Sequence, residues 1–134
     1  MRDKKWLESR FLQIWEFLFS DIDKKDKICI KWQGKWQNKF GHITKRLGKT
    51  EIAINSLFRS EKVPEYIIDL TIAHELVHYM HGFFSKHDKK HIDPHAGNVV
   101  DRELVRRGFG IMMKKEHEWV QKNWGRIYNS LKNL

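Results

Sequence analysis

The residues with the strongest chemical signature form the pattern His-Glu-x-x-His, made by His74, Glu75 and His78. Positions i and i+4 of an α-helix lie one turn apart on the same face, so both imidazoles can bind one metal ion. Zinc suits two histidine ligands and a position left open for water, because catalytic zinc sites are built in that way. Glu75 follows the first ligand and could take the proton of this water as a general base. The spacing therefore predicts a hydrolytic site for one Zn²⁺ ion.

The residues around the pattern are apolar, which predicts a buried helix; they are Ile72, Ala73, Leu76, Val77 and Tyr79. Pro64 is expected at the first position of this helix, and Gly82 follows its end at residue 80 or 81. The alternative is a histidine pair that only makes hydrogen bonds in the core. The pattern on a buried helix favours the metal site.

A third protein ligand has to come from the chain after His78, and the candidates are Glu103, His95, His87 and Asp101. Asp101 is about 200° around the predicted helix from Glu103 and should face solvent. Glu103 shares a predicted helix face with the apolar residues of that helix, so it should face the core. A buried carboxylate without a partner costs several kcal/mol, so it needs a metal ion or a salt bridge, for example to Arg106, Arg107 or a lysine. His95 lies on the same inward side, and His87 lies in the preceding loop. We therefore expect Glu103 as the third ligand, with His95 and His87 as alternatives that bind the metal or the substrate.

The first half of the chain has to support this helix. Apolar residues recur every three or four positions over residues 3–20, which predicts an amphipathic helix. Alternating apolar residues predict a strand over residues 28–32, and two more strands are expected over 40–44 and 51–55. Gly48 lies between the last two strands, which favours a hairpin.

The second half is predicted to be helical. After a histidine-rich loop, Asp93-Pro94 predicts the start of a helix that ends at residue 107 or 108. A last helix is expected over residues 112–132. The predicted fold class is α+β, with a small, mainly antiparallel sheet of about three strands packed on the two motif helices and with flanking helices at both ends.

The composition limits the kind of protein. The 134 residues suit a single domain, with the scaffold of the site over about residues 28–108 and flanking helices over about 3–20 and 112–132. The one cysteine, Cys29, excludes an intramolecular disulfide and a zinc site made of cysteines. No apolar run is long enough to span a membrane, and a lone cysteine suits a reducing compartment, so a cytoplasmic location is expected.

The segment from His74 to His78, followed 25 residues later by Glu103 on its own helix, resembles the gluzincin metallopeptidases. The length and layout of the chain are most similar to the minigluzincins, a group of small soluble peptidases. This resemblance implies a zincin-like fold, a zinc-dependent peptidase activity on a peptide or protein substrate, and Glu103 as the third ligand. It also implies a latent form in which a flanking helix covers the cleft, to which Glu116, His117 and Glu118 could lend a fourth ligand.

A second resemblance is to the SprT-like and YgjP-like zincins, and it lies in the segments KFGHIT (39–44) and IAINSL (52–57) before the helix. These families use a third histidine, which favours His87 or His95, although His95-Ala96-Gly97 matches their downstream pattern only approximately. In zincins the strand beside the active-site helix pairs with the extended substrate. Residues 51–55 are expected in that role.

Two other function classes stay open, and the net charge of +9, from 26 Lys and Arg against 17 Asp and Glu, favours the first of them. One is a protease or binding module associated with nucleic acid, with Trp32 and Trp36 as candidates for base stacking beside a basic cluster of Lys24, Lys25, Lys27, Lys45, Arg46 and Lys49. An ordinary solvated surface would explain the same cluster. The other class is a zinc-stabilised domain without turnover, which a fourth protein ligand would favour.

Overall fold

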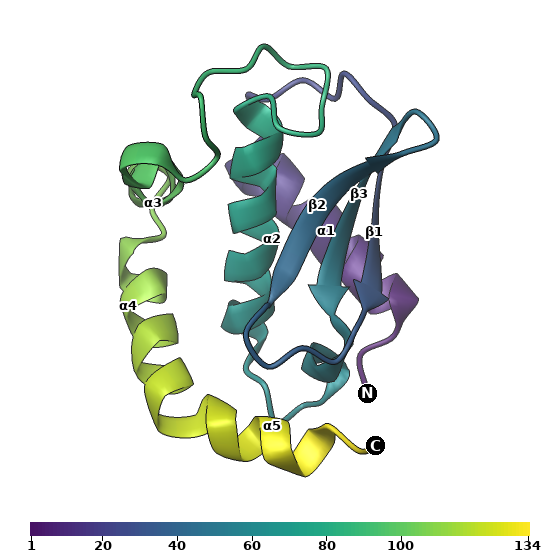
Figure 1. Cartoon of the computed structure of the whole chain (residues 1–134), viewed down its shortest axis with the longest axis vertical. Helices are drawn as coiled ribbons and strands as arrows, with labels where there is room; N and C mark the ends of the chain where they lie inside the picture. Colours follow the sequence, from purple (N-terminus) through teal and green to yellow (C-terminus); the bar gives the residue numbers. More distant parts are fainter.

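The computed structural model describes residues 1–134 and confirms the α+β class (Figure 1). The strands are β1 (Ile28–Gln33), β2 (Gly41–Arg46) and β3 (Lys49–Asn55). The helices are α1 (Lys4–Leu18), α2 (Glu65–Met80), α3 (Val99–Arg106), α4 (Gly110–Trp119) and α5 (Gly125–Leu131). Short helical segments complete the chain: η1 (Ser56–Arg59), η2 (Ala96–Asn98) and η3 (Val120–Trp124). None of the helices combines the length and the apolar character needed to cross a membrane.

The three strands form a mixed sheet in which β3 lies between β1 and β2. β2 and β3 make the expected antiparallel hairpin, whereas β1 runs parallel to β3. The sheet was expected to be mainly antiparallel, but one of its two strand pairs is parallel. The reason is that residues 34–40 cross from β1 to the far side of the sheet, so that β3 later pairs between β1 and β2. Asn55, at the end of β3, holds that segment by donating side-chain hydrogen bonds to the carbonyls of Trp36 and Lys39, at 2.7 and 3.0 Å.

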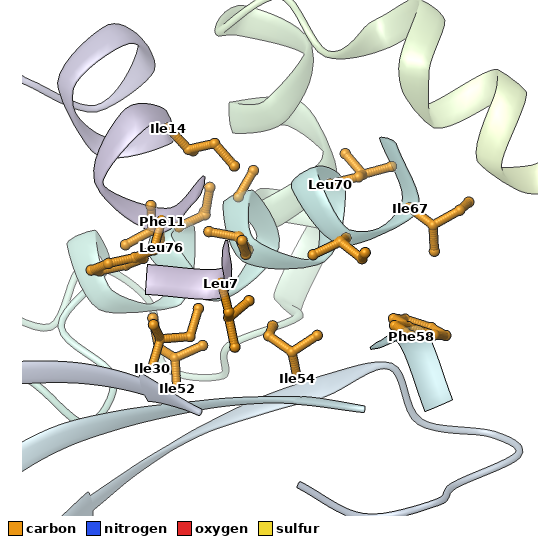
Figure 2. Close-up of a cluster of buried hydrophobic side chains, with 14 of the residues drawn as sticks. Leu7, Phe11, Ile14, Ile30, Ile52, Ile54, Phe58, Ile67, Leu70 and Leu76 are labelled. Atoms are coloured by element: carbon orange, nitrogen blue, oxygen red, sulfur yellow. The ribbon is translucent and has the colours of Figure 1, made fainter. Parts of the chain in front are cut away.

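The core lies between one face of the sheet and the helices α1 and α2. Figure 2 shows side chains of both helices meeting those of the sheet; the labelled contributors are Leu7, Phe11, Ile14, Ile30, Ile52, Ile54, Phe58, Ile67, Leu70 and Leu76. Most of α2 is buried, because it packs against α1, the sheet, α3 and α4. Burial on almost every side holds this helix, and the histidine pair on it, in one position.

The helix expected to start at Asp93-Pro94 starts later, at Val99. The Asp93 carboxylate accepts a hydrogen bond from the backbone N–H of His95 (2.9 Å), which closes a turn in place of a helix N-cap. Gly97 and Asn98 then adopt left-handed backbone angles, with φ of 58° and 56°, so a helix cannot run through them. The prediction of this start was wrong because an aspartate can cap a turn as well as a helix.

The last predicted helix is present but bent. It begins at Gly110 and ends at Leu131, and five residues of π-helical hydrogen bonding, η3, separate α4 from α5. In Figure 1 the chain changes direction here and passes under the rest of the molecule. Trp124 anchors the bend, because its indole N–H donates to the carbonyl of Gln37 (2.7 Å) and its ring packs against Phe40 and Phe58. This contact ties the C-terminal helices to the core.

Candidate metal centre

Three histidines from two parts of the chain converge beside α2. His74 and His78 lie on successive turns of that helix, with their Nε2 atoms 3.1 Å apart. His95 approaches from the turn before η2, and the nitrogen atoms that the three rings offer all lie within 4.8 Å of one another. Ligand atoms around a tetrahedral zinc ion lie about 3.3 Å apart, since Zn–N distances are about 2.0–2.1 Å. The three imidazoles therefore form a donor set that suits zinc.

The electrostatic state of the α2 histidines also suits a metal. Burial lowers the pKa of His74 to about 4, and the neighbouring His95 adds to the effect. Burial lowers the pKa of His78 to about 3, with further contributions from His74 and His95. Both rings are therefore neutral at neutral pH, which is the form that binds metal ions.

Glu75 completes the predicted pattern. Its side chain is buried and makes no ion pair. Burial raises the pKa of Glu75 to about 8, and the positive charge of Lys39 opposes this shift only in part. With this pKa the carboxyl holds a proton at neutral pH in the metal-free protein. A metal cation at the histidines would lower the pKa and favour the ionised form, which is the form that a general base needs.

The histidines and Glu75 share one cavity of about 710 Å³. Its walls come from α2, from residues 40–43 at the start of β2, from Phe83 and Phe84 in the loop after α2, and from one side of α4. The α4 side chains that line it are Met113, Glu116 and His117. A substrate in this cavity would touch the edge of the sheet and the proposed metal at the same time.

Glu103 does not join the histidine group. It is buried, as expected, but its carboxylate is 2.8 Å from Nε of Arg107 and 3.3 Å from Nη1 of Arg106. Arg107 also forms a bidentate pair with Asp21, at 2.8 Å for each contact. Two guanidinium groups thus compensate the negative charge of the buried Glu103 carboxylate. A salt bridge to Arg106 or Arg107 was the alternative to metal binding that the sequence left open.

His87 lies apart from the site as well. Its Nε2 is 2.6 Å from the carbonyl oxygen of Asp23, and its ring packs against the edge of Tyr79. Glu116, His117 and Glu118, the candidates for a fourth ligand, are also outside the group of three histidines, although Glu116 and His117 line the cavity.

Several cavity residues were not singled out as site residues by the sequence, among them Lys39, His42 and Thr71. Nothing in their type or spacing marks them, since they reach the cavity only because β2 and the residues before it pack against α2. The chain matches no protein-family model, no curated protein and no solved structure.

The substitution Glu116→Gln is expected to stabilise the protein at pH 8 and to have little effect at pH 5. Burial, and then the charge of Asp101, raise the pKa of Glu116 to about 7 from an ordinary 4.5. Because the folded chain holds this proton more tightly than the unfolded chain, the stabilisation is complete below pH 4.5 and is lost as the pH rises through 7. Glutamine is neutral at every pH, so the free energy of unfolding should rise by about 1–3 kcal/mol at pH 8.

Urea titrations of the metal-free protein at the two pH values measure this difference. Glu118→Gln, on the exposed side of α4, is the matched control and should change neither value. An equal effect of Glu116→Gln at both pH values would contradict the raised pKa.

Proposed function

We propose that this protein is a zinc-dependent metallopeptidase in which His74, His78 and His95 hold the metal and Glu75 is the general base. The observation that carries the proposal is the convergence of three imidazole nitrogens within 4.8 Å beside a buried carboxylate, in a cavity open to a substrate. A zinc ion bound there would acidify a water molecule and polarise the scissile carbonyl. Three protein ligands leave one position of a tetrahedral ion for that water.

Glu75 carries the proton in this reaction. Its carboxylate follows the ligand His74 directly in the helix and has no cation paired with it, so an oxygen is free to accept a proton from the attacking water. The same group then returns the proton to the amine that leaves when the peptide bond breaks. Each proton taken is thus given back within one turnover.

The free edge of β2 is the place for an extended peptide. β3, which the sequence suggested for this role, is paired on both sides and has no backbone groups to offer. β2 is an edge strand, and its residues 41–43 line the cavity beside α2. Backbone pairing of a substrate with this edge would bring a peptide bond to the histidines, which favours peptides over small-molecule esters or amides.

The ligand set bears on the family. Three histidines are what the resemblance to the SprT-like and YgjP-like zincins implies, whereas the resemblance to the gluzincins and minigluzincins implies Glu103. The paired state of Glu103 and the place of His95 favour the histidine set. In this proposal α4 forms a wall that narrows the cavity. In a latent form of the enzyme, the same helix would keep large substrates out.

Removal and return of zinc test this function. We expect the protein freed of metal by a chelator to bind one Zn²⁺ per chain in calorimetry and to gain about 2.7 kcal/mol of stability at a free zinc concentration 100 times the Kd. Hydrolysis of a library of quenched fluorogenic peptides should vanish with the chelator and return with zinc.

Two results would count against the proposal in different ways. A chain that takes up no zinc has no metal centre of this kind. A chain that binds one zinc and is stabilised, yet cleaves no peptide or unfolded protein, would be the zinc-stabilised domain without turnover.

A further inference from the structure

Three loops gather at one end of the sheet. They are the segment before β1, the turn between β2 and β3, and the loop after α2, all near the top of Figure 1. Thr50 links them, because its N–H donates to the carbonyl of Lys27 (2.8 Å) and its hydroxyl donates to the carbonyl of Phe84 (2.7 Å). The N–H of Lys86 donates to the Asp26 carboxylate at 2.7 Å. These contacts place the three loops on one surface.

Six cations on these loops are called the basic pole: Lys25, Lys27, Lys45, Arg46, Lys49 and Lys86. The loops also carry Lys24 and Lys89, which lie over the rings of Trp15 and Phe83, and Lys90, which donates to the carbonyl of Met80. None of the six takes part in an ion pair, since the salt bridges of the molecule use Arg10, Lys31, Arg106 and Arg107. The exposed acids on the same loops are Asp21, Asp23, Asp88 and Asp93, and Asp21 is paired with Arg107. The positive charge of the pole is therefore available to a negatively charged partner.

An apolar side chain projects from the middle of these cations. Leu47 is 89% exposed at the tip of the hairpin, and its φ is 52°. With Gly48, also at positive φ, it makes a two-residue turn in which asparagine or aspartate is favoured and a leucine is strained. Phe84, also at positive φ, is 51% exposed beside Thr50. Phe84 also lines the cavity, whereas Leu47 is not among the cavity residues.

The two tryptophans expected to stack on nucleic-acid bases, Trp32 and Trp36, are elsewhere. Trp32 is paired with Ile54, at the opposite end of the sheet from the pairing of Ile28 with Thr50. Its indole N–H donates to the carbonyl of Asp3 and its ring stacks on Trp6, so it supports α1. Trp36 packs against His42 at that same far end. Phe84 is an exposed aromatic ring on the pole, but the more exposed apolar side chain there is Leu47. A leucine offers no flat face to a base, whereas it can enter a layer of lipid chains.

We propose that the basic pole binds the surface of a membrane rich in anionic phospholipids, with Leu47 and Phe84 in the boundary between headgroups and acyl chains. The six cations would lie over the headgroups, as in peripheral proteins that combine a basic patch with a few apolar anchors. Attachment is to the surface of the bilayer, and it does not depend on the metal centre.

Co-sedimentation with vesicles tests this proposal on the full chain at low and at physiological salt. The probes are vesicles of about 30% phosphatidylserine in phosphatidylcholine and vesicles of phosphatidylcholine alone. Leu47→Asn removes the apolar tip and puts a favoured residue in the turn, so it should fold at least as well as the wild type. Lys45→Gln/Arg46→Gln/Lys49→Gln removes charge from the pole, and Lys5→Gln/Lys115→Gln/Lys122→Gln removes the same charge from exposed sites elsewhere.

We expect binding to the anionic vesicles only, lowered about tenfold by Leu47→Asn and about a hundredfold by the pole variant, with the control variant little changed. Equal binding of the pole and control variants would overturn the proposal, as would no binding to anionic vesicles. An unchanged affinity of Leu47→Asn would overturn it too, because Leu47 would then not enter the bilayer. Displacement by a single-stranded oligonucleotide, with Leu47→Asn unaffected, would make the pole a nucleic-acid surface and would also overturn it.

Discussion

Replacing Glu75 with glutamine is expected to lower kcat for peptide hydrolysis by about 10²–10⁴-fold and to leave zinc binding nearly unchanged. Glutamine has the size and shape of glutamate, but its amide cannot take a proton from water. The side chain is not one of the three nitrogen donors, so the metal should remain. Activity on a fluorogenic peptide and zinc stoichiometry, measured on the same preparation, check both parts.

A second effect of this variant helps to show that it stays folded. Burial raises the pKa of Glu75 to about 8 in the metal-free protein, so ionising the group as the pH rises costs stability. Glu75→Gln should therefore be more stable than the wild type at pH 9 when both are free of metal. Glu61→Gln, at an exposed glutamate, is the control for activity and stability. Full activity of Glu75→Gln with zinc bound would end the proposed mechanism.

The second large effect is expected in a comparison of His95→Ala with Glu103→Gln. Removing one of three ligands should weaken zinc binding by about 10²–10³-fold, because a structural zinc site gains about 10–16 kcal/mol from its whole ligand set. Glu103 instead neutralises Arg106 and Arg107, so Glu103→Gln should leave the zinc affinity in place and lower the free energy of unfolding by about 1–3 kcal/mol. Arg107 keeps its pair with Asp21, which limits the loss.

Competition with a chromogenic chelator gives the zinc affinities, and urea unfolding of the metal-free variants gives the stabilities. His87→Ala is the matched control, since its ring contacts Tyr79 and Asp23 and does not contact the α2 histidine pair. The reverse pattern, with zinc lost in Glu103→Gln and kept in His95→Ala, would restore the glutamate-type site that the gluzincin resemblance implies.

Much of the fold could be predicted because its signals are local. The stripe of apolar residues in α1, the alternation in β1 and the glycine between β2 and β3 each depend on neighbours within a few positions. The parallel pairing of β1 with β3 could not be predicted in the same way. This pairing depends on the path that residues 34–40 take between β1 and β2. Contacts such as that of Asn55 with Trp36 hold this path, and they join residues far apart in sequence.

The candidate site likewise has features that local sequence determines and features that depend on tertiary contacts. The amino-acid sequence alone determined that His74 and His78 face one side of a buried helix with Glu75 next to them, because helical geometry relates residues four apart whatever surrounds them. It also determined that Glu103 is buried, since periodicity reports which face of a helix turns inward.

Only the tertiary structure decided which partners the inward-facing side chains of Glu103 and His95 contact. Periodicity carries no information on partners, so Glu103 was as compatible with a metal ion as with the guanidinium groups of Arg106 and Arg107. His95 reaches the histidine pair through a turn closed by Asp93 and two left-handed residues, a path of the backbone that no spacing rule describes. The third nitrogen donor is therefore a property of how the loop packs on α2, and a contact between segments distant in sequence forms only when the whole chain folds.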